Sequence, residues 1–376
     1  MSSLHLRFAI ASDLHIALPQ TIRRLPQRLH LVEFSISAFE AALAHLAMLD
    51  LDFLLLPGDL TQDGEPDNHR WLQERLQLLP FPVYVVPGNH DVLSPVPTEC
   101  SIGASEFPDY YRNCGYRDAK CLYYTQLLAP GLRLVALNSN QFTADGRQLG
   151  RIDAEQLSWL QDVLAASGQE QVLAMVHHNV LEHLPGQAKH PLGRRYMVDN
   201  AAELLEILHT AGVQLIFTGH LHVQDIAHNR QLYEITTGSL VSYPHPYRVL
   251  ELESDRGGEL KLTIQSFRVE QIPECANLTE FSREWLGDHS YPFMHKLVQC
   301  ADLELSETET EAIARDLRYF WADISAGDAV FDFQHFPLPV RQYFSTFGAL
   351  DASGKPMRID NQMQLALQAR TGCNPV

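Results

Sequence analysis

Five short segments of this sequence carry side-chain types that bind metal ions in proteins. Each segment directly follows an apolar run, and together they are Asp13-x-His15, Asp59, Asn89, His177 and His220-x-His222. Carboxylate, imidazole and amide oxygen groups suit ions such as Mn, Fe or Zn, and the lack of cysteine in the set disfavours a thiolate site. One strand-end histidine alone is usually a packing residue, so the prediction of a metal site depends on the whole set.

The apolar runs before these segments have the length of buried strands. They span residues 6–11, 53–56, 83–86, 172–176 and 213–217. Between them, apolar residues recur at helical spacing, as in 36–46 and 154–166. This alternation predicts a largely parallel central sheet, followed by antiparallel-looking strands after residue 233. Because ligands gather at the carboxyl ends of strands in such sheets, we expect the five segments to converge there.

Three glycines stand directly before expected ligands, at points where a strand must turn sharply. They are Gly58, Gly88 and Gly219. Glycine alone accepts a positive φ or a close backbone approach there without steric cost. Simple strand-to-helix turns would also explain these glycines, and both explanations can hold together.

The composition excludes several classes of partner. With 28 Lys plus Arg against 46 Asp plus Glu, the 376 residues carry a formal net charge of −18, which disfavours a nucleic-acid polymer. No apolar run approaches the ~18–20 residues that a membrane helix needs, and the sequence shows no secretory signal. The six cysteines are scattered and form no C-x-x-C pair, which is typical of reduced thiols. We therefore expect a cytoplasmic protein with no membrane partner.

The pattern changes after about residue 271, which divides the chain into a domain at 1–270 and an extension at 271–376. In the extension, Ser306 and Glu309 have the spacing of a helix-capping box. Apolar residues then recur on one helical face, and phenylalanines crowd the segment 331–347. This extension is expected to pack as a mainly helical unit. A lid over the active site and a homo-oligomer interface are the alternatives, and the sequence does not separate them.

The motif series resembles the calcineurin-like metallophosphoesterases over about residues 6–268. The resemblance is carried by Asp13-Leu14-His15, Gly58-Asp59, Gly88-Asn89-His90-Asp91, His177 and Gly219-His220-Leu221-His222. The stretch from Gly58 to Pro66, GDLTQDGEP, is closer still to the class III cyclic nucleotide phosphodiesterases, as is Asn138-Ser139 after a strand. The fold that this resemblance implies is an α/β β-sandwich of mixed sheets flanked by helices, with the C-terminal extension added.

The resemblance also implies a site for two divalent or mixed-valence transition-metal ions, Mn, Fe or Zn. One ion would be held by Asp13, His15, Asp59 and His222. The second would be held by Asp59, Asn89, His177 and His220, so that Asp59 bridges the pair. Two such ions can share a hydroxide that attacks phosphorus while both ions neutralise the phosphoryl oxygens.

Several further residues are expected near the substrate. His90 would protonate the leaving oxygen or stabilise charge there and, with Asn89, contact the substrate. In relatives an acidic residue three places after the bridging aspartate supports this histidine, but that place is Gln62 here. Asp63 follows, and either residue could take the role. His245 is a candidate for the substrate pocket, and Arg23, Arg24, Arg28, Arg194 and Arg195 could contact a phosphate or lie in solvated loops.

These observations predict an enzyme that hydrolyses phosphate esters, and 3′,5′-cyclic nucleotides such as cAMP are the first choice of substrate. The alternatives are a phosphomonoesterase or protein phosphatase that uses the same metals, and a non-catalytic scaffold with this fold. A scaffold should have lost ligands, yet every ligand position of the set is occupied. The expected partner is a small phosphate ester, for which local metal charge outweighs the acidic net charge.

Overall fold

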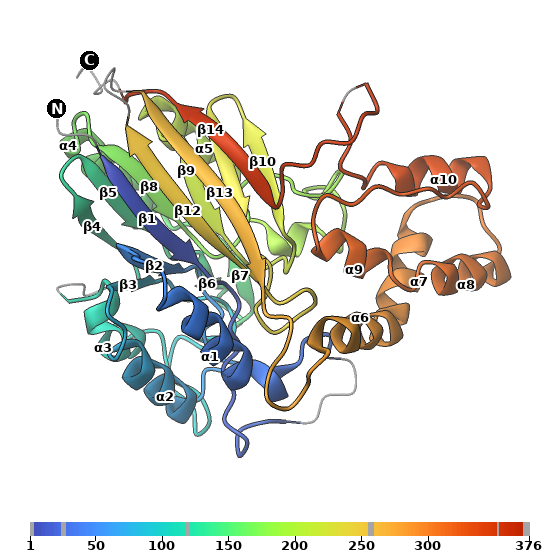
Figure 1. Ribbon diagram of the computed structural model, residues 1–376, viewed down its shortest axis with the longest axis horizontal. Helices are drawn as coiled ribbons and strands as arrows, with labels where there is room; N and C mark the ends of the chain where they lie inside the picture. The colour runs from blue at the N-terminus through green and yellow to red at the C-terminus, as the bar shows by residue number, and fades with distance from the viewer. Residues whose placement is uncertain (1–3, 24–27, 118–120, 255–258, 352, 371–376) are drawn as a thin grey trace.

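The computed structural model describes residues 4–23, 28–117, 121–254, 259–351 and 353–370. Two six-stranded mixed sheets pack face to face, and helices cover their outer sides (Figure 1). The expected sandwich of mixed sheets flanked by helices is therefore confirmed. The alternation of apolar runs and helical segments predicted parallel strands, and these strands are divided between the two sheets.

The first sheet has a parallel core and an antiparallel edge. Its strand order is β14-β13-β12-β1-β2-β3. The strands are β1 (His5–Ile10), β2 (Phe53–Leu56), β3 (Val83–Val85), β12 (Pro246–Ser254), β13 (Leu260–Arg268) and β14 (Gln362–Leu367). Strands β1, β2 and β3 are parallel, whereas β12 pairs antiparallel with both β1 and β13.

The second sheet repeats this plan with strand order β10-β11-β9-β8-β5-β4. The strands are β4 (Tyr124–Ala129), β5 (Leu132–Ala136), β8 (Gln171–Met175), β9 (Leu215–Thr218), β10 (Asp225–Asn229) and β11 (Leu232–Thr236). Strands β5, β8, β9 and β11 are parallel, and the edge strands β4 and β10 are antiparallel. In each sheet, therefore, parallel strands deliver their carboxyl ends to the same edge.

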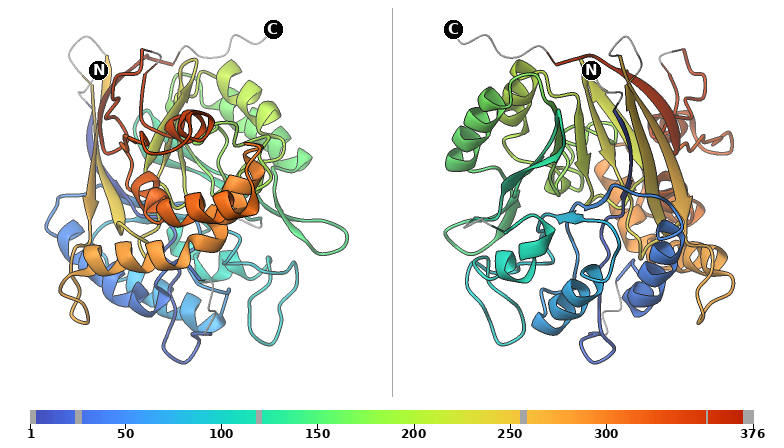
Figure 2. Two further views of the ribbon diagram at one scale, coloured as in Figure 1. Left: turned by 90° about the vertical axis from the view of Figure 1, so that its right-hand side faces the viewer. Right: turned by 60° about the vertical axis from the view of Figure 1, so that its left-hand side comes forward.

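The alternation of side chains along these strands separates two cores. In β8, Leu173 and Met175 belong to the core between the sheets, and Val172 and Ala174 belong to the core under the outer helices. Those helices are α4 (Ala154–Ala166) and α5 (Ala201–Thr210), which Figure 2 shows on the outer side of the second sheet. The polar turns after the strands therefore sit on a rigid, fully packed support.

The remaining helices of the first 270 residues lie mainly over the first sheet. They are α1 (Ser35–Leu46), α2 (Pro66–Leu76) and the single turn α3 (Phe107–Tyr110), with 3-10 turns at Val32–Phe34, Arg112–Cys114 and Arg194–Tyr196. A two-stranded ribbon, β6 (Asn140–Phe142) and β7 (Gln148–Gly150), follows β5. Helix α4 begins and ends where the sequence pattern placed it. Asp153 caps its first turn, since its side chain accepts from the backbone N–H of Gln156.

The extension forms a helical group on one side of the sandwich (Figures 1 and 2). Its helices are α6 (Leu278–His289), α7 (Tyr291–Cys300), α8 (Glu307–Asp316), α9 (Phe320–Ser325) and α10 (Leu338–Ser345). The Ser306–Glu309 capping box is present at the start of α8. The helices share one buried cluster with Leu192, Leu221 and Val223 of the preceding domain. After α10 the chain returns as β14, which pairs with β13 and was not predicted.

Arg248 of β12 is a fully buried arginine that ties the extension to both sheets. Its guanidinium donates to the backbone oxygens of Thr236 in β11 and of Asp360 before β14. It also donates to the Ser266 hydroxyl in β13. Burial lowers the pKa of Arg248 to about 10, so the group stays charged at neutral pH.

We expect Arg248→Met to lower the free energy of unfolding by about 3 kcal/mol, because buried acceptors lose a charged donor while the side-chain volume is kept. Chemical denaturation would measure the change. Lys261→Met, at an exposed position of the neighbouring β13, is the matched control and should stay within about 0.5 kcal/mol of the unmodified chain. An equal loss in both variants would contradict the clamp role of Arg248.

The sequence led us to expect no membrane-spanning helix and reduced cysteines. None of the helices in the described part of the chain is long and apolar enough to cross a bilayer. Within the same residues, Cys100, Cys114, Cys121, Cys275 and Cys300 are free thiols. Cys373 lies outside the described residues.

Candidate metal centre

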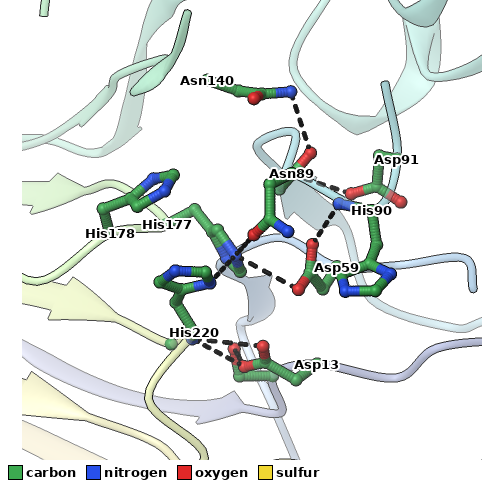
Figure 3. A network of polar contacts seen from close by, with 12 residues as sticks. Asp13, Asp59, Asn89, His90, Asp91, Asn140, His177, His178 and His220 are labelled. Atoms are coloured by element: carbon green, nitrogen blue, oxygen red, sulfur yellow. Dashed lines mark hydrogen bonds and ion pairs between the residues drawn. The ribbon is translucent and has the colours of Figure 1, made fainter. Parts of the chain in front are cut away.

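The structure brings together all seven residues that the sequence analysis singled out as metal ligands. They follow the carboxyl ends of β1, β2, β3, β8 and β9, so strands of both sheets contribute. One group of ligand atoms, from Asp13, His15, Asp59 and His222, lies within 4.8 Å of one another. A second group comes from Asp59, His177 and His220, with Asn89 beside it. Figure 3 shows Asp59, Asn89 and His220 directed toward His177.

The spacing between these atoms is that of donors around a shared ion. In the first group, His222 Nε2 lies 3.2 Å from Asp13 Oδ1 and 3.3 Å from His15 Nε2. In the second, His177 Nε2 lies 3.1 Å from Asn89 Oδ1, 3.1 Å from His220 Nδ1 and 3.3 Å from Asp59 Oδ2. Asp59 Oδ2 is also 3.8 Å from His15 Nε2. Ligands about 2.1 Å from one metal are separated by such distances.

Backbone carbonyls turn the unprotonated nitrogens of the second group inward. His177 Nδ1 donates to the Pro57 oxygen at 2.8 Å, and His220 Nε2 is directed at the Arg195 oxygen at 3.4 Å. When both imidazoles are neutral, each presents the lone pair of its other nitrogen to the centre. The lone pairs of His177 and His220 then meet the oxygens of Asn89 and Asp59, and a cation fits this arrangement.

The charge of the centre also favours a bound cation. Asp13 and Asp59 are 0% and 1% exposed, and among the described residues neither carboxylate pairs with a lysine or arginine. Burial raises the pKa of Asp59, but His177 and His90 hold it well below its usual value. Burial lowers the pKa of His177, but the Asp59 carboxylate raises it to about 9. The centre therefore attracts positive charge, which bound metal ions would supply.

The backbone at the centre is strained. Five non-glycine ligands have a left-handed φ, namely Asp13 (52°), His15 (42°), Asp59 (48°), His220 (68°) and His222 (58°). This region costs free energy for residues with a Cβ, and it persists where surrounding structure imposes it, often at functional sites. It lets side chains from one short turn, such as Asp13 and His15, reach the same point.

The three glycines have the roles expected of them. Gly58 has a φ of +96°, and a Cβ there would meet His177 Nδ1 at 2.4 Å. Gly88 and Gly219 allow close approach instead. A Cβ on Gly88 would stand 2.2 Å from Asp59 Oδ1, and one on Gly219 would stand 2.4 Å from Asp13 Oδ2. Each glycine leaves room for a ligand side chain.

Asp91 and Asn140 hold the turns from behind. Asp91 is fully buried and accepts from the backbone N–H groups of Leu60, Thr61 and Gly88. Burial raises the pKa of Asp91 to about 7, and the neighbouring Asp59 adds to this shift. Asn140 Nδ2 donates to the Gly88 oxygen at 3.2 Å, which fixes the turn that carries Asn89 (Figure 3). Asp91 thus orders the turns through these hydrogen bonds.

His90 lies beside the ligands with its ring supported by a backbone atom. Its Nδ1 donates to the Gln62 carbonyl oxygen at 2.6 Å, whereas Asp63 Oδ1 is 4.0 Å away. The backbone N–H of His90 donates to Asp59 Oδ1 at 2.8 Å. The sequence left open whether Gln62 or Asp63 supports His90. The main chain of Gln62 makes the hydrogen bond, and its side chain points elsewhere.

His30 belongs to this centre but was not predicted. Its ring stacks on His15 with centroids 4.3 Å apart, and its Nε2 is 3.0 Å from Gln62 Oε1. Burial and the neighbouring His222 and His90 lower the pKa of His30 well below its usual value. No apolar strand precedes His30, so the strand-end signal that revealed the other ligands could not reveal it.

Two other histidines, His178 and His245, make hydrogen bonds to protein atoms. His178 Nδ1 shares a hydrogen bond with the Ser139 hydroxyl at 2.8 Å, and its ring packs against His220. His245 is fully buried, and its Nδ1 donates to the Leu240 oxygen. His245 is not among the residues that line the cavity at the centre, so the structure does not bring it together with the other candidates.

A cavity of about 760 Å³ opens over the ligands. Its wall includes Leu286, Trp321 and Ser325 of the extension, and Arg195 and Tyr196 from the turn before α5. Arg28 also lines it, while its guanidinium pairs with Glu33. Arg24 lies outside the described residues. The extension therefore contributes part of the surface that a bound molecule would meet.

The chain has relatives of known family. Residues 6–224 match the family described as calcineurin-like phosphoesterase. A probable glycerophosphodiester phosphodiesterase of Arcobacter nitrofigilis is 23% identical over 67% of this chain and 85% of that protein. A probable cyclic nucleotide phosphodiesterase of Synechococcus sp. is 30% identical over 48% of this chain and 62% of that protein. A dimetal phosphatase structure from Danio rerio matches with a TM-score of 0.49 and 17% identity, covering 69% of this chain and 95% of that one.

Proposed function

Because this chain belongs to the calcineurin-like phosphoesterase family and is a hydrolase of phosphate esters, we propose that its substrates are phosphodiesters. The cyclic nucleotide phosphodiesterases among its relatives support 3′,5′-cyclic nucleotides such as cAMP as the first substrate. The chain covers 64% and 62% of two of these relatives, from Moraxella catarrhalis and Synechococcus sp., so the proposal needs support from the site itself.

The observation that carries the proposal is the convergence of seven ligand side chains, two of which are buried carboxylates that no arginine or lysine among the described residues compensates. We assign Asp13, His15, Asp59 and His222 to one metal ion and Asp59, Asn89, His177 and His220 to the other. When bound, two Mn, Fe or Zn ions would supply Lewis acidity toward the phosphoryl oxygens and activate water for the attack.

Three residues near the ligands, His90, Asn89 and Asp63, have proposed roles that follow from their own contacts. His90 donates from Nδ1 to the Gln62 carbonyl, so its Nε2 faces away from that support and can carry a proton to the leaving oxygen. His90 lines the cavity beside Asn89, so both can contact the ester. Asp63 Oδ1 lies 4.0 Å from His90 Nδ1, so a carboxylate stands on the side of the ring away from the proposed leaving oxygen.

A second candidate substrate is a glycerophosphodiester. The relative from Arcobacter nitrofigilis carries that name, and this chain covers 85% of its length. Both substrate classes share a diester phosphate with a single negative charge, which the same metal ions would hold. The cavity, rather than the metal centre, would then decide between them.

A metal-reconstitution experiment tests the proposal. The purified chain is stripped with a chelator, supplied with Mn²⁺, and assayed on cAMP, on glycerophosphoethanolamine and on p-nitrophenyl phosphate. We expect diester hydrolysis to disappear on stripping, to return with the metal, and to exceed monoester hydrolysis. Hydrolysis of the monoester alone would replace the proposal with a phosphatase, and no hydrolysis of any ester would favour a scaffold.

We propose that the extension, residues 271–376, is a fixed cap on the catalytic domain, residues 1–270, and selects the substrate. The shared buried cluster supports this, as does the bond from the Gln224 amide to the Ser325 oxygen at 3.1 Å. Deleting the cap would expose that cluster, so single substitutions are the cleaner test.

A reducing compartment such as the cytoplasm, supported by the described free thiols, remains our proposal for the location of the protein.

We expect Trp321→Leu to raise the KM for cAMP about tenfold, because the cavity loses a flat aromatic surface against which a base can stack. The kcat/KM for the small diester methyl p-nitrophenyl phosphate should change less than about threefold. Phe293→Leu is the matched control, since Phe293 packs on Trp321 with ring centroids 4.9 Å apart but does not line this cavity. If both variants raise the KM equally, general loosening of the cap is the cause.

A further inference from the structure

Two histidines line the cavity without a role in the metal assignment or the proton transfer, and one of them, His178, shares its Nδ1 hydrogen bond with the Ser139 hydroxyl. The other is His30. One of its ring nitrogens lies within 4.8 Å of a ring nitrogen of His15 and of His222. Its ring stacks on His15 at an interplanar angle of 19°. Its centroid is 6.2 Å from that of His90. His30 thus stands next to both the first metal group and the proton donor.

A short chain of hydrogen bonds decides which nitrogen of His30 carries a proton. Gln62 Nε2 donates to Asp63 Oδ1 at 3.3 Å, and the carboxylate can only accept, so the amide orientation of Gln62 is fixed. Gln62 Oε1 then faces His30 Nε2 at 3.0 Å and accepts its proton. Nδ1 of His30, whose ring lines the cavity, is then the nitrogen without this proton.

A neutral imidazole has one protonated ring nitrogen, and in His30 the bond to Gln62 Oε1 places that proton on Nε2. A neutral ring protonated at Nε2 has a lone pair at Nδ1. His30 therefore offers a hydrogen-bond acceptor, where most cavities that bind phosphate offer donors.

We propose that His30 Nδ1 accepts a hydrogen bond from a substrate hydroxyl on the carbon next to the scissile ester oxygen. This inference rests on the proposed phosphodiesterase function and names the substrates it favours. His90 and His30 both contact the ring of His15, with centroids 4.7 and 4.3 Å from it, so a substrate whose leaving oxygen meets His90 would bring the hydroxyl of the adjacent carbon toward His30. Gln62 joins the two, since its carbonyl supports His90 and its amide oxygen supports His30.

The class selected is therefore diesters of vicinal diols. A 3′,5′-cyclic ribonucleotide has its 2′-hydroxyl beside the 3′ ester oxygen. A glycerophosphodiester has its 2-hydroxyl beside the ester oxygen that is released when glycerol is the leaving alcohol. A 2′-deoxy cyclic nucleotide lacks this group and leaves the acceptor unpaired. A buried acceptor without a partner costs more than a missing attraction alone.

The test compares cAMP with 2′-deoxy-cAMP on the Mn²⁺-loaded full chain. We expect kcat/KM to favour cAMP by about tenfold. His30→Ala should bring the ratio to near one while the metal content, measured by mass spectrometry, stays at two ions per chain. Gln62→Leu, which frees the tautomer of His30, should reduce the ratio partly. His335→Ala, at an exposed position of the extension, should leave ratio and activity unchanged.

Three results would overturn the inference in distinguishable ways. Equal kcat/KM for the two substrates in the unmodified chain, with diesterase activity present, leaves the proposed function intact and removes the role of His30. Loss of bound metal in His30→Ala makes His30 a metal ligand. Absence of any diesterase activity in the unmodified, metal-loaded chain removes the proposed function and the inference with it. If His30→Ala does not fold, an unchanged ratio in Gln62→Leu contradicts the inference.

Discussion

Asp59→Ala is expected to lower kcat/KM for cAMP at least about 1,000-fold. Asp59 Oδ2 lies 3.3 Å from His177 Nε2 and 3.8 Å from His15 Nε2, so this oxygen is close to members of both ligand groups. Its removal should reduce the metal content from two ions per chain to one or none. Its Oδ1 also holds the backbone N–H of His90 at 2.8 Å.

The control for this prediction is Asp63→Asn. Asp63 is a nearby carboxylate, but it lies outside both ligand groups. We expect this variant to keep both ions and to lose less than about tenfold in kcat/KM. Circular dichroism would show that both variants are folded. Activity of Asp59→Ala within tenfold of the unmodified chain would contradict the bridging role.

His90→Ala is expected to lower kcat for cAMP by a factor of about 10²–10⁴, with the metal content unchanged. The reason is that His90 lines the cavity beside the ligands without belonging to either ligand group. Loss of a proton donor affects the chemical step, so kcat should fall much more than KM changes.

The leaving group gives this second prediction its control. p-Nitrophenolate leaves without needing a proton, whereas the ribose alkoxide needs one. His90→Ala should therefore lose at most about tenfold on bis(p-nitrophenyl) phosphate. The same large loss on both substrates would show that His90 positions the phosphate or a metal ligand, and the assignment as proton donor would be wrong.

The ligand set could be predicted from the sequence because each member follows an apolar strand by a fixed, short distance. Parallel strands then bring their ends together whatever lies between them, so Asp13 and His222 meet across more than 200 residues. The same logic predicted the strands and helix α4. The sequence signal for each ligand lies within a few residues of it, whereas the ligands that meet at the site are far apart in the chain.

The rest of the site depends on contacts that no local pattern encodes. His30 reaches the centre from a loop, and Trp321 reaches the cavity from the extension through a cluster that includes Leu221 and Val223. Strand β14 was missed because a six-residue edge strand with only two buried residues, Leu365 and Leu367, resembles a loop in sequence. These features follow from how separate elements pack.

The support of His90 shows a further limit of sequence reasoning. The choice between Gln62 and Asp63 was posed in terms of side chains, whereas the backbone oxygen of Gln62 makes the contact. Main-chain groups carry no residue type, so their roles are invisible until the turn is known. The left-handed φ of Asp59 and of the other ligands likewise has no signature in residue identity.

The central claim is that Asp13, His15, Asp59, Asn89, His177, His220 and His222 hold two metal ions that Asp59 bridges. Anomalous diffraction from crystals of the Mn²⁺-loaded chain tests it most directly. We predict two manganese peaks about 3.5–4 Å apart, with Asp59 between them and the other six residues divided as assigned. A single peak, two peaks that do not share Asp59, or manganese bound elsewhere on the chain would contradict the account.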